Sequence, residues 1–518
     1  MAQLPISGWS VRILRGKVGF FDNIIYGFQV TFQPINFLFC GIGVLVGTLV
    51  GVLPGIGPAG AMALLLPATF KFSPTSTLIL LAGIYYGVQY GGSTTSILVN
   101  IPGEASSVIT CLDGYQMARQ GRAGPALGIA AWGSFIAGTI ANMGLVLVAV
   151  PLARAALRFG PPEYFALMCT GLVIVTYLAQ GSILKAIMMA LVGIILGSIG
   201  LDIITGLPRF TFGINELTDG VGIIPLVMGL FGISEIFVNL EESLEREIFK
   251  TRIKNLWPSL KDWAQAKWAI VRGSIIGFLL GILPGGGAVI ATFVAYAVEK
   301  KVAKEPQRFG KGAIEGVAAP ESANNAAAGG SLIPLLSLGI PPNPIMAIFF
   351  SALIIHGIQP GPLLIKQHPD LFWGLVASLY LGNFLLLILN LPLISMWVKV
   401  LEIPYKLLFP LILLFCLIGA YSMNNVVFDL YVMIFFGVVG WIMRKFGYEG
   451  APLILAYVLG PMLENALRQS LLISQGSFMI FITRPISAIA LGIAFLLLLS
   501  NLFPYFKKQR EKYEEFKE

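Results

Sequence analysis

Long hydrophobic runs separated by short polar stretches extend over almost the whole chain. A transmembrane helix needs roughly 20 consecutive apolar residues, so the longer runs can each cross a bilayer. The shorter runs cannot cross alone and favour broken or re-entrant helices. The pattern therefore predicts an all-α integral membrane protein, with candidate spans at 35–53, 58–70, 76–89, 91–112, 125–152, 161–180, 183–204, 221–239, 271–283, 288–299, 313–330, 331–357, 372–398, 405–422, 426–443, 452–466 and 486–504.

Polar stretches divide this pattern into five parts. The longest, from Glu241 to Lys267, mixes acidic and basic residues with Trp257 and Trp263, which is typical of an amphipathic helix lying on a membrane surface. The expected parts are an interfacial N-terminal segment (1–33), a first membrane repeat (34–240), an amphipathic linker (241–270), a second membrane repeat (271–470), and a last transmembrane span with a charged cytoplasmic tail (471–518).

The second set of apolar runs repeats the first. Residues 47–57 (GTLVGVLPGIG) align without gaps onto residues 277–287 (GFLLGILPGGG), with the glycines and the Leu-Pro-Gly triplet in register. Further along, 91–102 resembles 329–341 with one extra residue. A shared lipid-facing composition explains similar hydropathy but not this ordered register of glycine and proline. The sequence therefore predicts a tandem duplication.

Basic residues indicate how the two halves are oriented. The loop after the first Leu-Pro-Gly motif holds only Lys71, whereas the equivalent second loop holds several basic residues between 300 and 311. Later the bias reverses, because Arg119 and Arg122 in the first half correspond to Lys366 with an aspartate in the second. Cytoplasmic loops are enriched in Lys and Arg. The two halves are therefore expected to be inverted-topology repeats, a common plan of secondary transporters.

Composition agrees with this class and excludes others. Only 12% of the residues are charged, against about 25% in a typical soluble domain. The net charge is +8, and the basic residues lie at the ends of apolar runs rather than in a nucleic-acid-binding patch. Two histidines and four scattered cysteines provide neither a multi-His metal site nor a disulfide framework. With no nucleophile–base pair or metal motif in view, the protein is not expected to be an enzyme, and no organic cofactor is expected.

Two matched pairs of segments are predicted to interrupt the helices. The first pair is 53–60 with 284–287, where prolines remove hydrogen-bond donors and glycines lower helix propensity. The second is the polar pair 91–107 and 320–343. Irregular backbone at membrane depth survives only beside protein or a water-filled cavity. The expected substrate-binding residues are Gly55, Gly57, Ser93, Thr94, Thr95, Asn100, Pro102, Gly103, Gly285, Gly286, Gly287, Asn324, Asn325, Gly329, Gly330, Ser331 and Pro341.

Acidic and amide side chains within the same segments are candidates for holding a coupling cation, because charged groups inside a membrane are costly and usually functional. The candidate ion-binding residues are Glu321, Ser322, Asn325, Thr95, Asn100 and Asp113, with Glu104 as a further acidic candidate. Alternative interpretations remain open: an acidic residue can pair with a loop arginine or cap a helix, and small residues often only let helices approach closely.

An ordered series of motifs resembles the large membrane subunit of the tripartite tricarboxylate transporters, the TctA family. The motifs are LVGVLPGIGPAGAMALLLPATF (49–70), YGGSTTSILVNIPGEASSVITCLDGYQMARQGRAGPALGIAA (90–131), RFTFG (209–213), GLFGISEI (229–236), GILPGGG (281–287), PESANNAAAGGSLIPLLSLGIP (320–341) and LGPMLENALRQSL (459–471). The resemblance implies a multi-pass permease of the bacterial inner membrane. It also implies a small TctB-like membrane subunit and a TctC-like extracytoplasmic solute-binding protein as partners, and an ion gradient, usually of Na⁺, as the energy source.

Together with the sequence, this resemblance implies a secondary active transporter subunit that imports small organic dicarboxylates or tricarboxylates by symport with Na⁺ or H⁺. The absence of a G-x-x-x-x-G-K-[ST] motif agrees with an ion gradient rather than ATP. Moving a trianion inward against 100 mV costs roughly 7 kcal/mol, so co-transported cations must offset its charge. An ion or solute channel and a non-transporting membrane scaffold remain the alternatives.

Overall fold

The computed structural model describes residues 20–53, 57–178, 182–202, 204–241, 256–285, 287–401 and 405–500. Predictions for residues 1–19, for 242–255 of the expected linker and for the tail from 501 lie outside these ranges. So do Gly55 and Gly286.

The described chain is helical almost throughout, with one short antiparallel pair of strands. The elements are α2 (Phe20–Thr31), α3 (Pro34–Val52), α4 (Gly57–Leu65), η1 (Leu66–Thr69), α5 (Pro74–Val99), η2 (Ala105–Ser107), α6 (Val108–Arg119), α7 (Ala123–Ala156), α8 (Pro161–Leu178), α9 (Ile183–Gly197), β1 (Gly200–Leu201), β2 (Pro208–Arg209), η3 (Asn215–Asp219), α10 (Ile223–Val227), η4 (Met228–Ile233), α11 (Ser234–Glu241), α12 (Leu260–Ile282), α13 (Gly287–Val302), η5 (Pro306–Arg308), α14 (Glu315–Leu338), α15 (Pro344–Ile355), α16 (Leu364–Gln367), α17 (Pro369–Asn390), α18 (Ile394–Leu401), α19 (Tyr405–Asn424), α20 (Val427–Lys445), α21 (Gly450–Ile473), α22 (Ile480–Thr483) and α23 (Pro485–Ser500).

Helices of membrane-spanning length are present in both halves of the chain. Among the described residues, five helices are long and apolar enough to cross a bilayer: α3, α7, α17, α20 and α21. Several shorter apolar helices accompany them, including α9, α15 and α23. Together these helices confirm the predicted all-α, multi-pass membrane protein.

The first pair of predicted helix breaks is present in the structure. Helix α3 ends at Val52 and α4 begins at Gly57, while α12 ends at Ile282 and α13 begins at Gly287. Gly57 and Gly287 both have positive φ angles, of 64° and 45°, which an L side chain rarely adopts. In both halves, one helix therefore ends and the next begins within a few residues of each other.

The polar segments of the second pair differ from the prediction, because they are largely helical. Helix α5 continues through Gly91–Val99, and α14 continues through Pro320 and Pro334. Hydroxyls there bond to carbonyls of their own helix, as when Ser93 Oγ donates to Gln89 O at 2.9 Å, so these polar groups are satisfied without unwinding the backbone. The breaks come only afterwards, at Asn100 (φ 57°) and Gly339 (φ 73°).

Matching glycine seams hold the paired helices together. A Cβ on Gly47 of α3 would lie 2.7 Å from Ile84 Cα of α5. A Cβ on Gly277 of α12 would lie 2.6 Å from Ala323 Cα of α14. Such distances leave no room for a side chain, so the two main chains touch in each pair. The aligned glycines of the two halves thus perform the same packing role.

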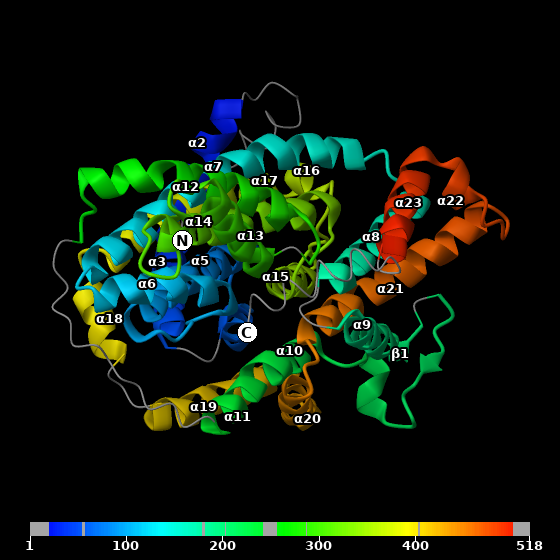
Figure 1. Ribbon diagram of the computed structural model, residues 1–518. Coiled ribbons are helices and arrows are strands. Elements are labelled where there is room, and N and C mark those ends of the chain that lie inside the picture. Colours follow the sequence, from blue (N-terminus) through cyan, green and yellow to red (C-terminus); the bar gives the residue numbers. More distant parts are fainter. Residues whose placement is uncertain are drawn as a thin grey trace.

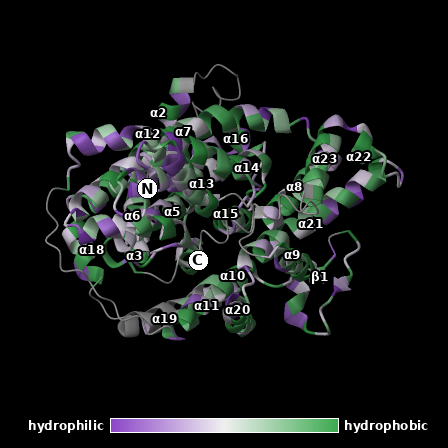
Figure 2. Cartoon of the chain, in the orientation of Figure 1, coloured by the Kyte–Doolittle hydropathy of each residue, from purple (hydrophilic) through white to green (hydrophobic). Residues whose placement is uncertain are grey.

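Figure 1 shows α3, α5, α12 and α14 gathered on one side of the molecule, and α8, α9, α21 and α23 on the other. Hydrophobic residues dominate α9 and α20, whereas hydrophilic residues are conspicuous around the strand pair (Figure 2). A large cluster of buried apolar side chains joins α5, α15 and α17 to α20. Helix α15 occupies the centre of the view, between the two sides (Figure 1).

Candidate functional site

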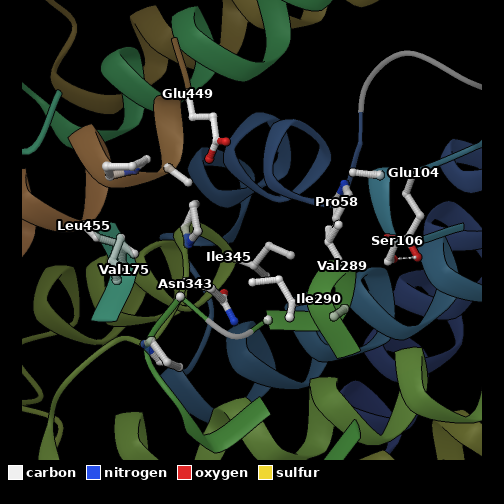
Figure 3. Close-up of a pocket in the computed structure, with 18 of the residues that line it drawn as sticks. Pro58, Glu104, Ser106, Val175, Val289, Ile290, Asn343, Ile345, Glu449 and Leu455 are labelled. Atoms are coloured by element: carbon white, nitrogen blue, oxygen red, sulfur yellow. Dashed lines mark hydrogen bonds between the residues drawn. The ribbon is translucent and has the colours of Figure 1, made fainter. Parts of the chain in front are cut away.

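A cavity of about 220 Å³ lies where the interrupted helices of both halves meet. Its wall comprises Pro58, Tyr85, Glu104–Ser106, Val175, Gly285, Gly287–Ile290, Pro342–Ile345, Glu449, Ala451, Pro452 and Leu455. Figure 3 shows Asn343, Ile345 and Ile290 together near the middle of the view, with Glu104 and Glu449 on different sides. The cavity is large enough for a small organic molecule.

Several helices begin at this cavity. The first turns of α4, α13, α15 and α21 all contribute wall residues. The first N–H groups of a helix have no partner within the helix, and they carry its positive dipole end. Helix N-termini are therefore ready-made anion sites, and several of them around one cavity favour a negatively charged ligand.

Asn343 organises the start of α15. Its side-chain Oδ1 accepts a hydrogen bond from Met346 N at 2.9 Å, and Pro344 occupies the first helical position. This is a favourable N-terminal sequence, because the cap satisfies one orphan donor and proline has no N–H to leave unpaired. The side chain of Asn343 also lines the cavity.

The two break regions of the second half are bonded to each other. Gly285 N donates to Pro342 O at 2.9 Å, which joins the 283–285 segment to the 339–343 segment. Gly285 has φ 74°, and a Cβ there would lie 2.6 Å from Val175 Cα. Glycine is therefore needed at this position both for the backbone angle and for the close approach of α8.

The cavity wall contains carboxylates but no cationic side chain. Glu104 and Glu449 belong to the wall, and no Lys, Arg or His is among the described residues that form it. An anion in this cavity would depend on backbone N–H groups for attraction. The nearby acidic groups favour simultaneous binding of a proton or a cation.

Two buried carboxylates, Glu104 in this wall and Glu321 outside it, connect the two halves of the chain. Glu321 Oε1 accepts from Thr110 Oγ1 at 2.5 Å, and Glu321 Oε2 accepts from Ser93 Oγ. Glu104 Oε1 accepts from Asn324 Nδ2 at 2.7 Å. Glu321 is 1% exposed and Glu104 is 8% exposed. Since α14 carries Glu321 and Asn324 while the other groups belong to α5, α6 and the segment between them, this layer joins the two halves of the chain.

These donors to the two carboxylates are neutral hydroxyl and amide groups. Glu104 Oε1 also accepts from Ser106 Oγ at 2.6 Å, and Asn324 Oδ1 accepts from Gln89 Nε2 at 3.0 Å. Neutral donors do not balance a buried negative charge. The layer is therefore suited to exchange a proton or a small cation.

The structure brings some of the predicted site residues together and separates others. Gly285 and Gly287 line the larger cavity, whereas Ser93, Glu321 and Asn324 lie in the hydrogen-bonded layer behind it. Three others bond to backbone carbonyls: Thr95 donates to Val52 O at 2.9 Å, Asn325 to Glu321 O at 3.2 Å, and Ser331 to Ala328 O at 2.8 Å. The remaining ones pack within or between helices or lie in the turn after α5: Gly103, Gly329, Gly330, Ser322, Pro341, Asn100 and Pro102.

Glycine at three of these positions is explained by helix contact. A Cβ on Gly103 would meet the carbonyl oxygen of Gly51, one on Gly329 would lie 2.8 Å from Ala141 Cβ, and one on Gly330 would lie 2.5 Å from Phe278 O. These glycines thus face neighbouring chain segments.

Asp113 holds a loop. Its Oδ1 accepts from the backbone N–H groups of Gly310, Gly312 and Ala313 at 2.9, 2.8 and 2.7 Å, and its Oδ2 accepts from Tyr296 Oη at 2.9 Å. Both oxygens are therefore engaged in fixing the segment between α13 and α14.

Sequence reasoning left Gln89, Thr110 and Glu449 out of the candidate set. Gln89 had a usable signal, since a polar amide four residues before Ser93 in an apolar run lies on the same helix face. Glu449 had none, because it lies just before α21, outside the two matched pairs of segments.

Comparison with known proteins identifies related chains. Residues 37–455 match the sequence model of the tripartite tricarboxylate transporter TctA family. An uncharacterized 52.8 kDa protein in the TAR-I ttuC' 3'region of Agrobacterium vitis is 53% identical over 491 residues, covering 95% of this chain and 98% of that protein. An uncharacterized protein in the TAR-II ttuC' 3'region of Agrobacterium vitis is 53% identical over 236 residues, covering 46% of this chain and 98% of that protein. No solved structure matches the chain.

Proposed function

Because the chain belongs to the tripartite tricarboxylate transporter TctA family, we propose that it is the substrate-conducting subunit of a secondary active transporter. It imports small organic dicarboxylates or tricarboxylates together with a cation, Na⁺ or H⁺, across the bacterial inner membrane. A TctC-like solute-binding protein delivers the substrate, and a small TctB-like membrane subunit completes the assembly.

The 220 Å³ cavity carries this proposal, because the starts of four helices surround it. A substrate carboxylate there accepts hydrogen bonds from the free N–H groups of α13, α15 and α21. The apolar wall residues, such as Ile290 and Ile345, contact the carbon skeleton. This combination selects compact organic anions over inorganic ions, which have no apolar part to bury.

Charge balance supports symport. A carboxylate substrate in a cavity that also contains Glu104 meets a like charge, which weakens binding unless a cation or proton enters with it. The same pairing removes the electrical cost of importing an anion into a negatively charged cell interior. Substrate and cation are therefore bound in the same step.

Opposite orientation of the two halves in the membrane completes the proposal. The repeated order of helix, Pro-Gly break and second helix in α3–α4–α5 and α12–α13–α14 supports it, as does the reversed bias of basic loops. In such transporters, substrate sites lie between the repeats and access alternates between the two sides.

The proposal is tested by uptake of radiolabelled di- and tricarboxylates into proteoliposomes that contain the full chain with its partner subunits. The informative substitution is Asn343→Asp, since aspartate caps a helix as well as asparagine does but adds a negative charge to the wall. We expect the KM for the carboxylate to rise about tenfold or more, from charge repulsion at short range.

Asn343→Ser is the matched control, because serine keeps the cap without a charge and should leave the KM within a few-fold of the wild-type value. Equal KM values for the Asp and Ser variants would contradict an anion site at α15. Downhill, non-saturating flux of the carboxylate would instead indicate a channel. A complete lack of uptake by the assembled wild-type complex would indicate a scaffold.

A further inference from the structure

A second, much smaller cavity of about 10 Å³ lies among α5, α7 and α17. Polar side chains from all three helices line it: Tyr90, Ser93 and Thr94 from α5, Ser134 from α7, and Asn390 from α17. The Tyr90 hydroxyl donates to Asn383 Oδ1 at 2.7 Å. These helices lie side by side (Figure 1). A volume of this size holds about one water-sized particle.

Two oxygens in this wall have no hydrogen-bond partner among the described residues. They are Ser134 Oγ and Asn390 Oδ1, on side chains that are 1% and 4% exposed respectively. The Asn390 amide is oriented, because its Nδ2 donates to Leu386 O at 2.9 Å. Buried polar atoms are nearly always paired, so unpaired oxygens facing one small cavity indicate a ligand that accepts lone pairs.

The Ser93 hydroxyl separates the Glu321 carboxylate from the cavity. Ser93 Oγ lies within hydrogen-bond distance of both Gln89 O and Glu321 Oε2, and its single hydrogen can be donated to only one of them at a time, so an oxygen lone pair stays available to a neighbour in the cavity. Glu321 itself is 1% exposed and is held by neutral donors. A cation at the small cavity would balance its charge across the Ser93 hydroxyl.

The chemistry of the wall selects the kind of cation. The polar side chains of the wall offer hydroxyl and amide oxygens and no thiol or imidazole, which suits a hard cation and not a thiophilic or imidazole-bound metal. One nearby carboxylate matches a single positive charge, whereas protein sites for Ca²⁺ or Mg²⁺ use carboxylates as direct ligands. A compact monovalent ion fits these conditions.

We propose that Ser93, Thr94, Ser134 and Asn390 bind one Na⁺ ion, with Glu321 as its counter-charge, and that this ion is the coupling ion. The inference rests on the proposed carboxylate symport and names the cation and its site. Helix α14 connects the two sites, because Glu321 faces the ion while Asn324, three residues later, donates to Glu104 in the wall of the substrate cavity.

The site is tested by thermal unfolding of the purified full chain without substrate, as NaCl replaces choline chloride at constant ionic strength. A ligand that binds only the folded state raises Tm with its concentration. We expect Na⁺ to raise the Tm of the wild type, and KCl to have little effect. Ser134→Ala should raise the Na⁺ concentration of half-maximal effect at least several-fold, and Asn390→Ala should do the same.

Ser378→Ala is the matched control. Ser378 is a buried residue of α17 whose Oγ donates to Leu375 O at 2.7 Å, and it is not part of the cavity wall. Its Na⁺ response should equal that of the wild type. Without Na⁺, Ser134→Ala should be as stable as the wild type or more so, because it removes an unpaired buried hydroxyl.

An unchanged Na⁺ response in both the Ser134 and Asn390 variants would overturn the site, and so would stabilisation of the wild type by K⁺ and choline as well as by Na⁺. The unfolding assay contains no carboxylate, so it separates this inference from the proposed function. If the wild type accumulates carboxylate and both variants show the same Na⁺ dependence of uptake as the wild type, the transport function is supported and the ion site is contradicted.

Discussion

Asp113 and Glu321 are both buried carboxylates of the polar region, but they receive different kinds of hydrogen bond. Three of the donors to Asp113 are backbone N–H groups of one loop, which stay in place as long as the loop is folded. The donors to Glu321 are the hydroxyls of Ser93 and Thr110, which can rotate toward another acceptor. The first arrangement fixes structure, and the second permits exchange of a ligand.

Asp113→Asn should therefore lower stability without changing cation dependence. The variant loses the charge that strengthens the bonds from Gly310, Gly312 and Ala313, and we expect a loss of about 2 kcal/mol. Tyr296→Phe removes only one bond to Asp113 and should cost about 1 kcal/mol. Denaturant unfolding of the detergent-solubilised protein measures both. Unaltered stability combined with a changed Na⁺ requirement would instead favour Asp113 as an ion ligand.

Asp202 gives the strand pair a defined dependence on pH. Hydrogen bonds from the backbone N–H groups of Thr205 and Ile204, together with the nearby Arg468, lower the pKa of Asp202 to about 2. Because the folded pKa lies below the usual value of 3.8, the stabilisation is complete above about pH 4 and is lost as the pH falls toward 2.

Pepsin cleavage between residues 200 and 209 should therefore remain slow at pH 4 and accelerate as the pH approaches 2. Pepsin should cut the Asp202→Asn variant quickly at both pH values, since the asparagine side chain cannot ionise. Peptide mapping of the digests locates the cuts. Identical pH profiles for the wild type and the variant would show that Asp202 does not hold this segment.

At the scale of elements, the glycine seams explain why the two halves share a motif. The aligned glycines lie on the faces where α3 meets α5 and where α12 meets α14. Their spacing in the sequence predicted two matched units. It did not reveal that the glycines face a partner helix rather than the substrate, because close packing and ligand access require the same small residue.

Gly47→Ala and Gly41→Ala form a matched pair on α3. The first places a Cβ 2.7 Å from Ile84 Cα, and overpacking of this kind typically costs about 1–3 kcal/mol. The second meets nothing within 4 Å and should be neutral or slightly stabilising, because alanine favours a helix. Fluorescence-detected size exclusion after heating measures the folded fraction of each. Equal losses at both positions would mean that α3 and α5 are not in backbone contact.

The helix breaks show what sequence reasoning can and cannot predict. The breaks after Leu53 and Leu283 were predicted correctly, since proline and glycine act on the backbone itself. Unwinding at 91–99 was predicted wrongly. Ser93 and Ser96 bond to carbonyls one turn back in α5, and burial among packed helices then favours the helical form.

At the scale of the whole molecule, the larger cavity is assembled from segments between Pro58 and Leu455. Sequence reasoning predicted that the Pro-Gly breaks would border a chamber, and Gly285 and Gly287 do line it. The contributions of α8 and α21 could not be predicted in the same way. Neither Val175 nor Leu455 differs in type from residues that face lipid, so only the tertiary arrangement assigns them to the wall.

Cysteine accessibility tests this assembly across its two sides. In a chain whose four native cysteines are replaced, Ala288→Cys of α13 and Ala451→Cys of α21 should both react with a hydrophilic maleimide. Bound substrate should slow both reactions several-fold, because it occupies the cavity that they share. Ala137→Cys, at a fully buried position of α7, is the unreactive control. Protection of one wall cysteine but not the other would mean that α13 and α21 do not face the same ligand.

The backbone contacts between α3 and α5 also determine where the molecule can bend. Gly43, Gly47 and Gly51 bring the two main chains together on three successive turns, so no layer of side chains is present to shear. Each such pair should therefore translate as one stiff unit. The movements that admit or release solute should therefore occur where helices meet through larger side chains. One such place is the border of the cavity formed by Ile345 of α15 and Leu455 of α21.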